Sequence, residues 1–147
     1  MSSGLTLRNR QRTRPVEMRT LRRTLTGLLR ELFQQEKFEL GFYLVAAPEM
    51  TRLNETFLRH QGSTDVIAFD YADPARPGFL AGEVFICVDE AIIQARRFRT
   101  TWQSEVVRYA IHGLLHLRGY DDHAPRARAR MKREENRLLG LAEGWPE

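Results

Sequence analysis

The chain has 147 residues, of which 42% are hydrophobic and 29% charged, and its net charge is +4. This composition predicts one globular domain over residues 1–147 with a single core, and the lack of any apolar run of about 20 residues excludes a membrane-spanning helix. One cysteine, Cys87, excludes an intrachain disulfide, and residues 1–14 lack the apolar core of a secretory signal, so we expect a cytoplasmic protein.

The first half of the chain alternates between helical and extended patterns. Leucines at helical spacing after Pro15 predict an amphipathic helix over residues 15–35. The run "FELGFYLVA" at 38–46 is rich in aromatic and β-branched residues and predicts a strand. Pro48 opens a short helix that extends to about Arg59, and "STDVIAFDY" at 63–71 predicts a second strand.

The second half begins with a loop at 72–82 that holds two prolines and two glycines. A strand at 83–88 follows, with Glu83, Phe85 and Cys87 on one face and the other three residues on the opposite face. We expect Cys87 to be a small core residue. Asp89 is a suitable N-cap for a helix that runs to about Arg99.

Two more helices complete the predicted fold. One begins between Thr101 and Ser104 and ends at Gly119, and the last runs from Pro125 to about Leu139. The sequence therefore predicts an α/β (α+β) fold with a single-layer mixed sheet of about four strands flanked by helices.

Positive charge is carried almost entirely by arginine and is unevenly placed. Residues 8–30 contain eight arginines against one acid, Glu17, and residues 126–133 contain five basic side chains. Basic stripes of this kind attract phosphate backbones. A solvated arginine-rich surface explains them equally well, so charge alone leaves nucleic-acid binding undecided.

The stretch "HGLLHLRGYDDH" holds three of the four histidines of the chain. His112 and His116 are four residues apart, so on a helix their rings project from the same face. Their neighbours are mostly apolar, and burying two unpaired imidazoles there would be costly. A zinc ion removes that cost and suits imidazole ligands, whereas an incidental pair of histidines remains the alternative interpretation.

A third ligand must come from beyond the helix. Gly119 can adopt the left-handed conformation that ends the helix and turns the chain, so that the side chain of Asp122 or His123 reaches the ion. The HExxH pattern of metalloproteases is absent, because Gly113 stands where the glutamate base would follow the first histidine.

Three ordered blocks between about residues 40 and 140 resemble the YbeY family of bacterial metal-dependent endoribonucleases. "HGLLHLRGYDDH" is similar to the family motif H-G-x-L-H-L-x-G-Y-D-H. "LNETFLRHQGSTDVIAFDY" resembles the family's L-N-x-x-Y-R followed by T-D-V-L-S-F, and "GEVFICVDEA" matches the segment between the two signatures. The resemblance implies a mixed sheet, a zincin-like metal-site helix and one zinc ion per chain, held by three side chains beside a cleft.

The sequence departs from the family motif at two positions. At the position of the family's third histidine this chain has Asp122, and His123 is the next residue. At the position of the family's usual arginine it has Leu58, and Arg59 is the next residue. A subgroup of the family resembles this chain at both positions. The resemblance therefore favours Asp122 as the third zinc ligand. His123 is the alternative ligand, or a group that supports the site or contacts substrate. Arg59 is the candidate for holding a substrate phosphate.

Two further residues have a functional and a structural interpretation each. His60 either contacts substrate or is a solvated loop residue. Asp65 either lines the cleft beside the metal or stabilises the turn where its strand begins. No residue pattern assigns a general base or an oligomeric state.

The resemblance implies a zinc-dependent, single-strand-specific endoribonuclease that acts in late maturation of small-subunit ribosomal RNA and in ribosome quality control. Its partners would then be ribosomal RNA and the small ribosomal subunit, and not a membrane. Two alternatives stay open: a zinc hydrolase of another substrate, and a ribosome-associated RNA-binding protein in which the metal is structural.

Overall fold

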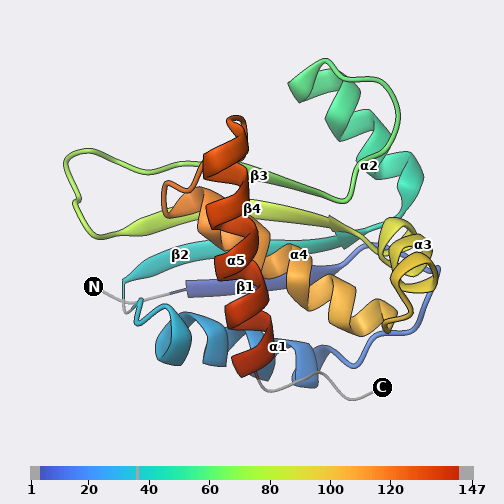
Figure 1. Ribbon diagram of the computed structural model, residues 1–147, viewed down its shortest axis with the longest axis horizontal. Helices are drawn as coiled ribbons and strands as arrows, with labels where there is room; N and C mark the ends of the chain where they lie inside the picture. The colour runs from blue at the N-terminus through green and yellow to red at the C-terminus, as the bar shows by residue number, and fades with distance from the viewer. Residues whose placement is uncertain (1–3, 36, 143–147) are drawn as a thin grey trace.

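The computed structural model describes residues 4–35 and 37–142 and contains a four-stranded mixed sheet (Figure 1). The strand order is β1-β2-β4-β3, with β1 parallel to β2, β2 parallel to β4, and β3 antiparallel to β4. The strands are β1 (Gly4–Asn9), β2 (Phe38–Val45), β3 (Val66–Asp70) and β4 (Leu80–Cys87). The predicted mixed α/β sheet is confirmed.

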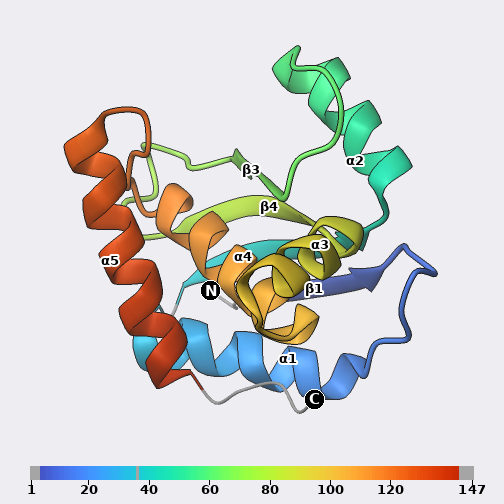
Figure 2. The same cartoon turned by 45° about the vertical axis from the view of Figure 1, so that its right-hand side comes forward.

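Helical segments connect the strands and follow them. They are α1 (Met18–Gly27) with its π-helical continuation η1 (Leu28–Leu32), α2 (Ala47–Leu53) with the π-helical η2 (Asn54–Leu58), α3 (Val88–Phe98), α4 (Trp102–Leu117) and α5 (Pro125–Leu141). Helix α4 contacts β3 and β4 on one side and α5 on the other, so it lies between the sheet and α5 (Figure 2). Within the described ranges, none of the helices combines the length and apolar character that crossing a bilayer requires.

The N-terminal segment differs from the sequence-based prediction, which assigned no strand to residues 1–14. Residues Gly4–Asn9 form β1, an edge strand that pairs with β2. Its half-buried Leu5 and Leu7 pack against the core, while Arg8 is exposed. Two apolar residues in six give too weak an alternation to identify a strand. Residues Gly4–Asn9 form a strand because they pair with the edge of β2.

The two faces of β4 enter two separate cores, as the alternation in the sequence predicted. Val84 and Ile86 belong to the large core between the sheet and helices α1 and α4. Phe85 and Cys87 belong to a small core on the opposite face, together with Met50 from α2. Cys87 is fully buried there, which confirms its predicted role as a core residue.

The predicted N-cap role of Asp89 is wrong. Strand β4 runs directly into α3, which places Cys87 at the N-cap and Asp89 inside the first helical turn. The Asp89 carboxylate instead accepts a hydrogen bond of 2.6 Å from the backbone N–H of Ala47, the first residue of α2. Asp89 thus connects the start of α2 to α3, and its carboxylate supplies a hydrogen-bond acceptor for one of the backbone N–H groups that have no partner within α2.

Two glycines allow α4 to approach β4 closely. A Cβ at Gly113 of α4 would lie 2.7 Å from a methyl group of Val84, and a Cβ at Gly82 of β4 would lie 2.5 Å from the backbone oxygen of Phe69 and 2.9 Å from Leu117. Non-bonded carbon atoms prefer separations of about 3.5–4.0 Å. The two elements can therefore keep this separation only while both positions lack a side chain.

We expect Gly82→Ala to destabilise the protein by about 1–3 kcal/mol, because the new methyl group meets a backbone oxygen that is fixed in the sheet. Gly140→Ala in α5 is the matched control, since a Cβ there has no atom within 4 Å and alanine favours helix. Chemical denaturation of the two variants would measure both effects. Equal stability of the two variants would contradict the close-approach argument.

Candidate metal centre and the pockets beside it

Helix α4 carries both histidines and ends where the sequence predicted. Thr101 caps its start by accepting a hydrogen bond of 3.1 Å from the N–H of Ser104. Its last turn closes through bonds from Gly119 N–H to the His116 carbonyl (3.0 Å) and from Tyr120 N–H to the Leu115 carbonyl (2.9 Å). Gly119 has φ of +95°, the left-handed conformation that glycine adopts without strain. The chain then turns back along the helix.

This turn brings Asp122 to the two histidines. The Asp122 Oδ2 atom lies 3.3 Å from His116 Nε2 and 3.6 Å from His112 Nε2. One ligand atom from each of the three residues lies within 4.8 Å of the other two. Four ligands arranged tetrahedrally around zinc at 2.0–2.1 Å are about 3.3 Å from one another. The spacing and the chemistry of this metal cluster, His112, His116 and Asp122, therefore fit a divalent metal ion.

His123 occupies a different position. Its side chain is 90% exposed, and its Nε2 lies 3.9 Å from the Asp121 carboxylate. Asp121, Asp122 and His123 form a second, more exposed group of potential ligands. Of the two candidates that the sequence left open, Asp122 is the one that the structure brings to His112 and His116.

Helix α5 supplies Glu135, which sequence reasoning missed. Its Oε2 atom lies 2.7 Å from His112 Nδ1, although the two residues are 23 positions apart in the chain. The side chain is 5% exposed, and Met131 and Leu138 flank it on the inward face of α5. A hydrogen bond from Nδ1–H to Glu135 leaves Nε2 free to face Asp122 and a metal ion. The sequence held one signal that could have identified Glu135, namely an acidic residue on the apolar face of a helix, between Met131 and Leu138.

The surrounding charges favour a cation at this place. Burial acts to lower the pKa of His112, but the hydrogen bond to Glu135 and the charges of Glu135, Asp65 and Asp122 outweigh it, so the pKa lies above its usual value. Burial acts to raise the pKa of Glu135, yet its hydrogen bonds to His112 and Arg108 hold it below the usual value. Glu135 is therefore ionised and able to fix the orientation of the His112 ring.

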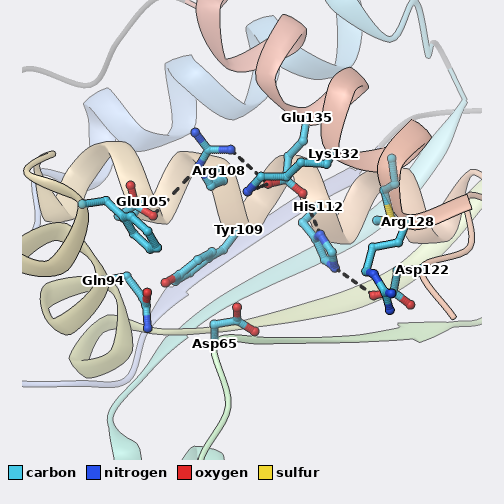
Figure 3. Close-up of a pocket in the computed structure, with 12 residues that line it drawn as sticks. Asp65, Gln94, Glu105, Arg108, Tyr109, His112, Asp122, Arg128, Lys132 and Glu135 are labelled. Atoms are coloured by element: carbon cyan, nitrogen blue, oxygen red, sulfur yellow. Dashed lines mark hydrogen bonds and ion pairs between the residues drawn. The ribbon is translucent and has the colours of Figure 1, made fainter. Parts of the chain in front are cut away.

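The metal cluster lies where two hollows meet. The first, here called the side pocket, has a volume of about 230 Å³ and runs between α3, α4 and α5 (Figure 3). Its wall residues are Asp65, Gln94, Phe98, Glu105, Arg108, Tyr109, His112, Asp122, Arg128, Met131, Lys132 and Glu135. The second, here called the strand groove, has a volume of about 500 Å³ and runs along β3 past His112, His116, Asp122 and His123. His112 and Asp122 line both.

The remaining predicted residues lie around these hollows. Asp65 lines both, and its Oδ1 also accepts a bond of 2.8 Å from Val66 N–H, which confirms the predicted structural role at the strand start. His60 lines the strand groove. Arg59 ends η2 with φ of +58° and lines a separate neighbouring hollow with Glu55 and His60. The structure does not bring Arg59 to either hollow that contains the metal cluster, so its phosphate contact stays a prediction.

Comparison with known proteins identifies the family. The family model described as "Endoribonuclease YbeY" matches residues 6–142. A protein of that name from Elusimicrobium minutum is 36% identical over 109 residues, which cover 73% of this chain and 76% of the relative. The one from Chlorobium luteolum is 43% identical over 88 residues, which cover 60% of this chain and 62% of the relative, somewhat under two thirds of its length.

A solved structure shares the fold. The solution structure of TM1509 from Thermotoga maritima superimposes with a TM-score of 0.61 at 23% identity, covering 94% of this chain and 91% of that one. At this identity the likeness supports the fold alone. Because the family model spans nearly the whole described chain, the chain belongs to the YbeY family.

Proposed function

We propose that this chain is a zinc-dependent endoribonuclease that cleaves single-stranded RNA. The observation that carries the proposal is the cluster of His112, His116 and Asp122 at the junction of two hollows, in a chain whose relatives are named endoribonucleases. The substrate in the cell is then small-subunit ribosomal RNA during late maturation and quality control, with the small ribosomal subunit as partner. The basic clusters at 8–30 and 126–133 supply positive charge for such a partner.

The ligand set supports a catalytic ion rather than a structural one. Catalytic zinc sites commonly use three protein ligands and keep one position open, whereas structural sites are closed by four. His123, the nearest further donor along the chain, has its ring turned to Asp121 and solvent. A bound zinc ion would supply a Lewis acid for hydrolysis of a phosphodiester. The three donors His112, His116 and Asp122 would bind one zinc ion per chain.

Side chains of the protein itself provide the remaining functions. Glu135 holds the His112 ring in place through Nδ1. Arg128 and Lys132 line the side pocket from α5, where their charges favour a phosphate beside the cluster. Arg108 is committed to Glu135 (3.1 Å) and Asn136 (2.8 Å), so it stabilises the support of His112. Arg128 and Lys132 would then bind the RNA backbone without reading its sequence.

We expect the zinc-loaded protein to cleave a fluorescently labelled single-stranded RNA and to leave the matching duplex intact. Removal of the metal with a chelator should abolish cleavage, and added zinc should restore it. Casein and a nitrophenyl ester serve as substrates of other zinc hydrolases and should not be turned over. RNA binding that survives chelation without any cleavage would instead support an RNA-binding protein with a structural metal.

Asp122→Ala should reduce bound zinc well below one ion per chain, because it removes the carboxylate 3.3 Å from His116 Nε2. His123→Ala, one residue away, should retain zinc, since that ring is 90% exposed. Elemental analysis of identically purified proteins would measure both. Loss of zinc in His123→Ala alone would show that His123 is the third ligand, and loss in both variants would indicate a closed, structural site.

Glu135→Gln should weaken zinc binding by about 10–100-fold, because the neutral amide no longer supports the His112 ring with a negative charge. Glu134→Gln is the matched control, since the neighbouring Glu134 pairs with Arg137 on the surface. Competition against a chromophoric chelator would measure both affinities. Unchanged affinity in Glu135→Gln would mean that Glu135 has no part in holding the metal ligand.

A further inference from the structure

Tyr109 lies on the wall of the side pocket and carries a buried, unpaired hydroxyl group. The residue is 5% exposed, and within the described part of the chain its Oη atom has no hydrogen-bond partner. In Figure 3 the hydroxyl points toward the space beside Gln94 and Asp65. Burial of a hydroxyl without a partner is unfavourable, and such groups are rare in folded proteins. A ligand that enters the side pocket would supply the missing partner.

Three side chains with acceptor oxygens line the same pocket: Gln94, Glu105 and Asp65. Gln94 donates its amide N–H to Glu90 (2.8 Å), which leaves its carbonyl oxygen for the pocket. Glu105 accepts one bond from Thr100 (2.7 Å) through Oε2, and its Oε1 stays 3.9 Å from Arg108. The Asp65 carboxylate is the third acceptor on these walls. Together they suit a ligand that carries N–H donors.

The Tyr109 hydroxyl is itself available as a donor. Burial first, and then the charges of Asp65 and Glu105, raise the pKa of Tyr109 well above its usual value, so the phenol keeps its proton. The ligand should therefore present one acceptor beside its donors. This mixed pattern is found on the Watson–Crick edge of a nucleobase.

The size of the side pocket is compatible with a ligand as small as one nucleobase. The side pocket, at about 230 Å³, lies below the range of about 300–1,000 Å³ that is usual for drug-sized ligands. Phe98, at the end of α3, lines the pocket and is 61% exposed, with the guanidinium carbon of Arg97 5.5 Å from its ring centroid. A base that enters the pocket can stack on the exposed part of this ring. The opposite end of the pocket reaches His112 and Asp122 of the metal cluster.

We propose that the side pocket is a nucleobase subsite, selective for a base with an exocyclic amino group, next to the phosphate at the metal cluster. This proposal rests on the proposed function and specifies its substrate. Adenine, cytosine and guanine donate amino hydrogens to the acceptors on the wall, while Tyr109 donates to a ring nitrogen or carbonyl. Uracil lacks the amino group and leaves at least one of these acceptors, of which Glu105 is buried, without that hydrogen bond.

Equilibrium binding of nucleoside monophosphates to the zinc-loaded protein tests the subsite without requiring cleavage. We expect CMP, AMP and GMP to bind about tenfold more tightly than UMP, a difference of one good hydrogen bond. Inosine monophosphate, which differs from GMP only by the missing 2-amino group, should bind more weakly than GMP. Equal binding of all these nucleotides would overturn the proposal.

Tyr109→Phe removes only the unpaired hydroxyl and gives the sharpest comparison. It should weaken CMP binding about five- to tenfold, leave the binding of inorganic phosphate unchanged, and leave Tm equal or higher, because no existing bond is lost. Tyr71→Phe is the matched control, since its hydroxyl donates to Glu83 at 2.7 Å elsewhere on the sheet. A lower Tm with unchanged CMP binding in Tyr109→Phe would show that the hydroxyl is structural.

Phe98→Ala tests the stacking contact independently. It should weaken binding of every nucleotide without changing that of phosphate, whereas Ile93→Ala, a 55% exposed position on the same helix, should change neither. Unchanged nucleotide binding in Phe98→Ala would remove the stacking part of the proposal. Cleavage of RNA without base-dependent binding refutes the subsite alone, and base-dependent binding without cleavage refutes the proposed function alone.

Discussion

The close contact between α4 and β4 determines where the chemistry of this protein takes place. Gly113 sits against Val84, and Gly82 sits against Leu117, so each element has a glycine where the other has a bulky side chain. Gly113 directly follows His112, and the packed face of α4 fixes the direction in which the histidine face points. The positions of His112 and His116 are thus set by core packing, which would lower the cost of ordering them around a metal ion.

The charged groups beside this helix act as one network rather than as separate pairs. Glu135 accepts from His112 and pairs with Arg108, while Asp122 approaches both histidines. A buried carboxylate such as that of Glu135 is tolerated only when it has a partner. The negative charge near the histidines favours a cation, and Arg128 and Lys132 on α5 place positive charge at the same pocket. A metal ion and an anionic substrate can therefore be accommodated side by side.

The helix and turn that carry the metal cluster were predictable from neighbouring residues, and contacts between residues far apart in the chain were not. The histidine pair and the glycine turn at Gly119 follow from helical spacing and local backbone preference, which left Asp122 and His123 both open as the third ligand. The family resemblance favoured Asp122, the residue that the structure brings to the two histidines. Glu135 contacts His112 across 23 residues, so only the packing of α5 on α4 reveals it. Strand β1 depends in the same way on its pairing with β2. Asp89 failed as a predicted cap because β4 continues directly into α3.

The proposed nucleobase subsite in the side pocket would give a physical reason for the proposed preference for single strands. Its walls include the buried hydroxyl of Tyr109, so a base that makes hydrogen bonds there has left its stack and its pairing partner. In a duplex the same edge is occupied, and the cost of freeing it opposes binding. A flexible strand instead can place one base in the side pocket, its phosphate at His112 and Asp122, and its continuation along the strand groove past His116. Selection of single strands and selection of a base would then arise from the same contact.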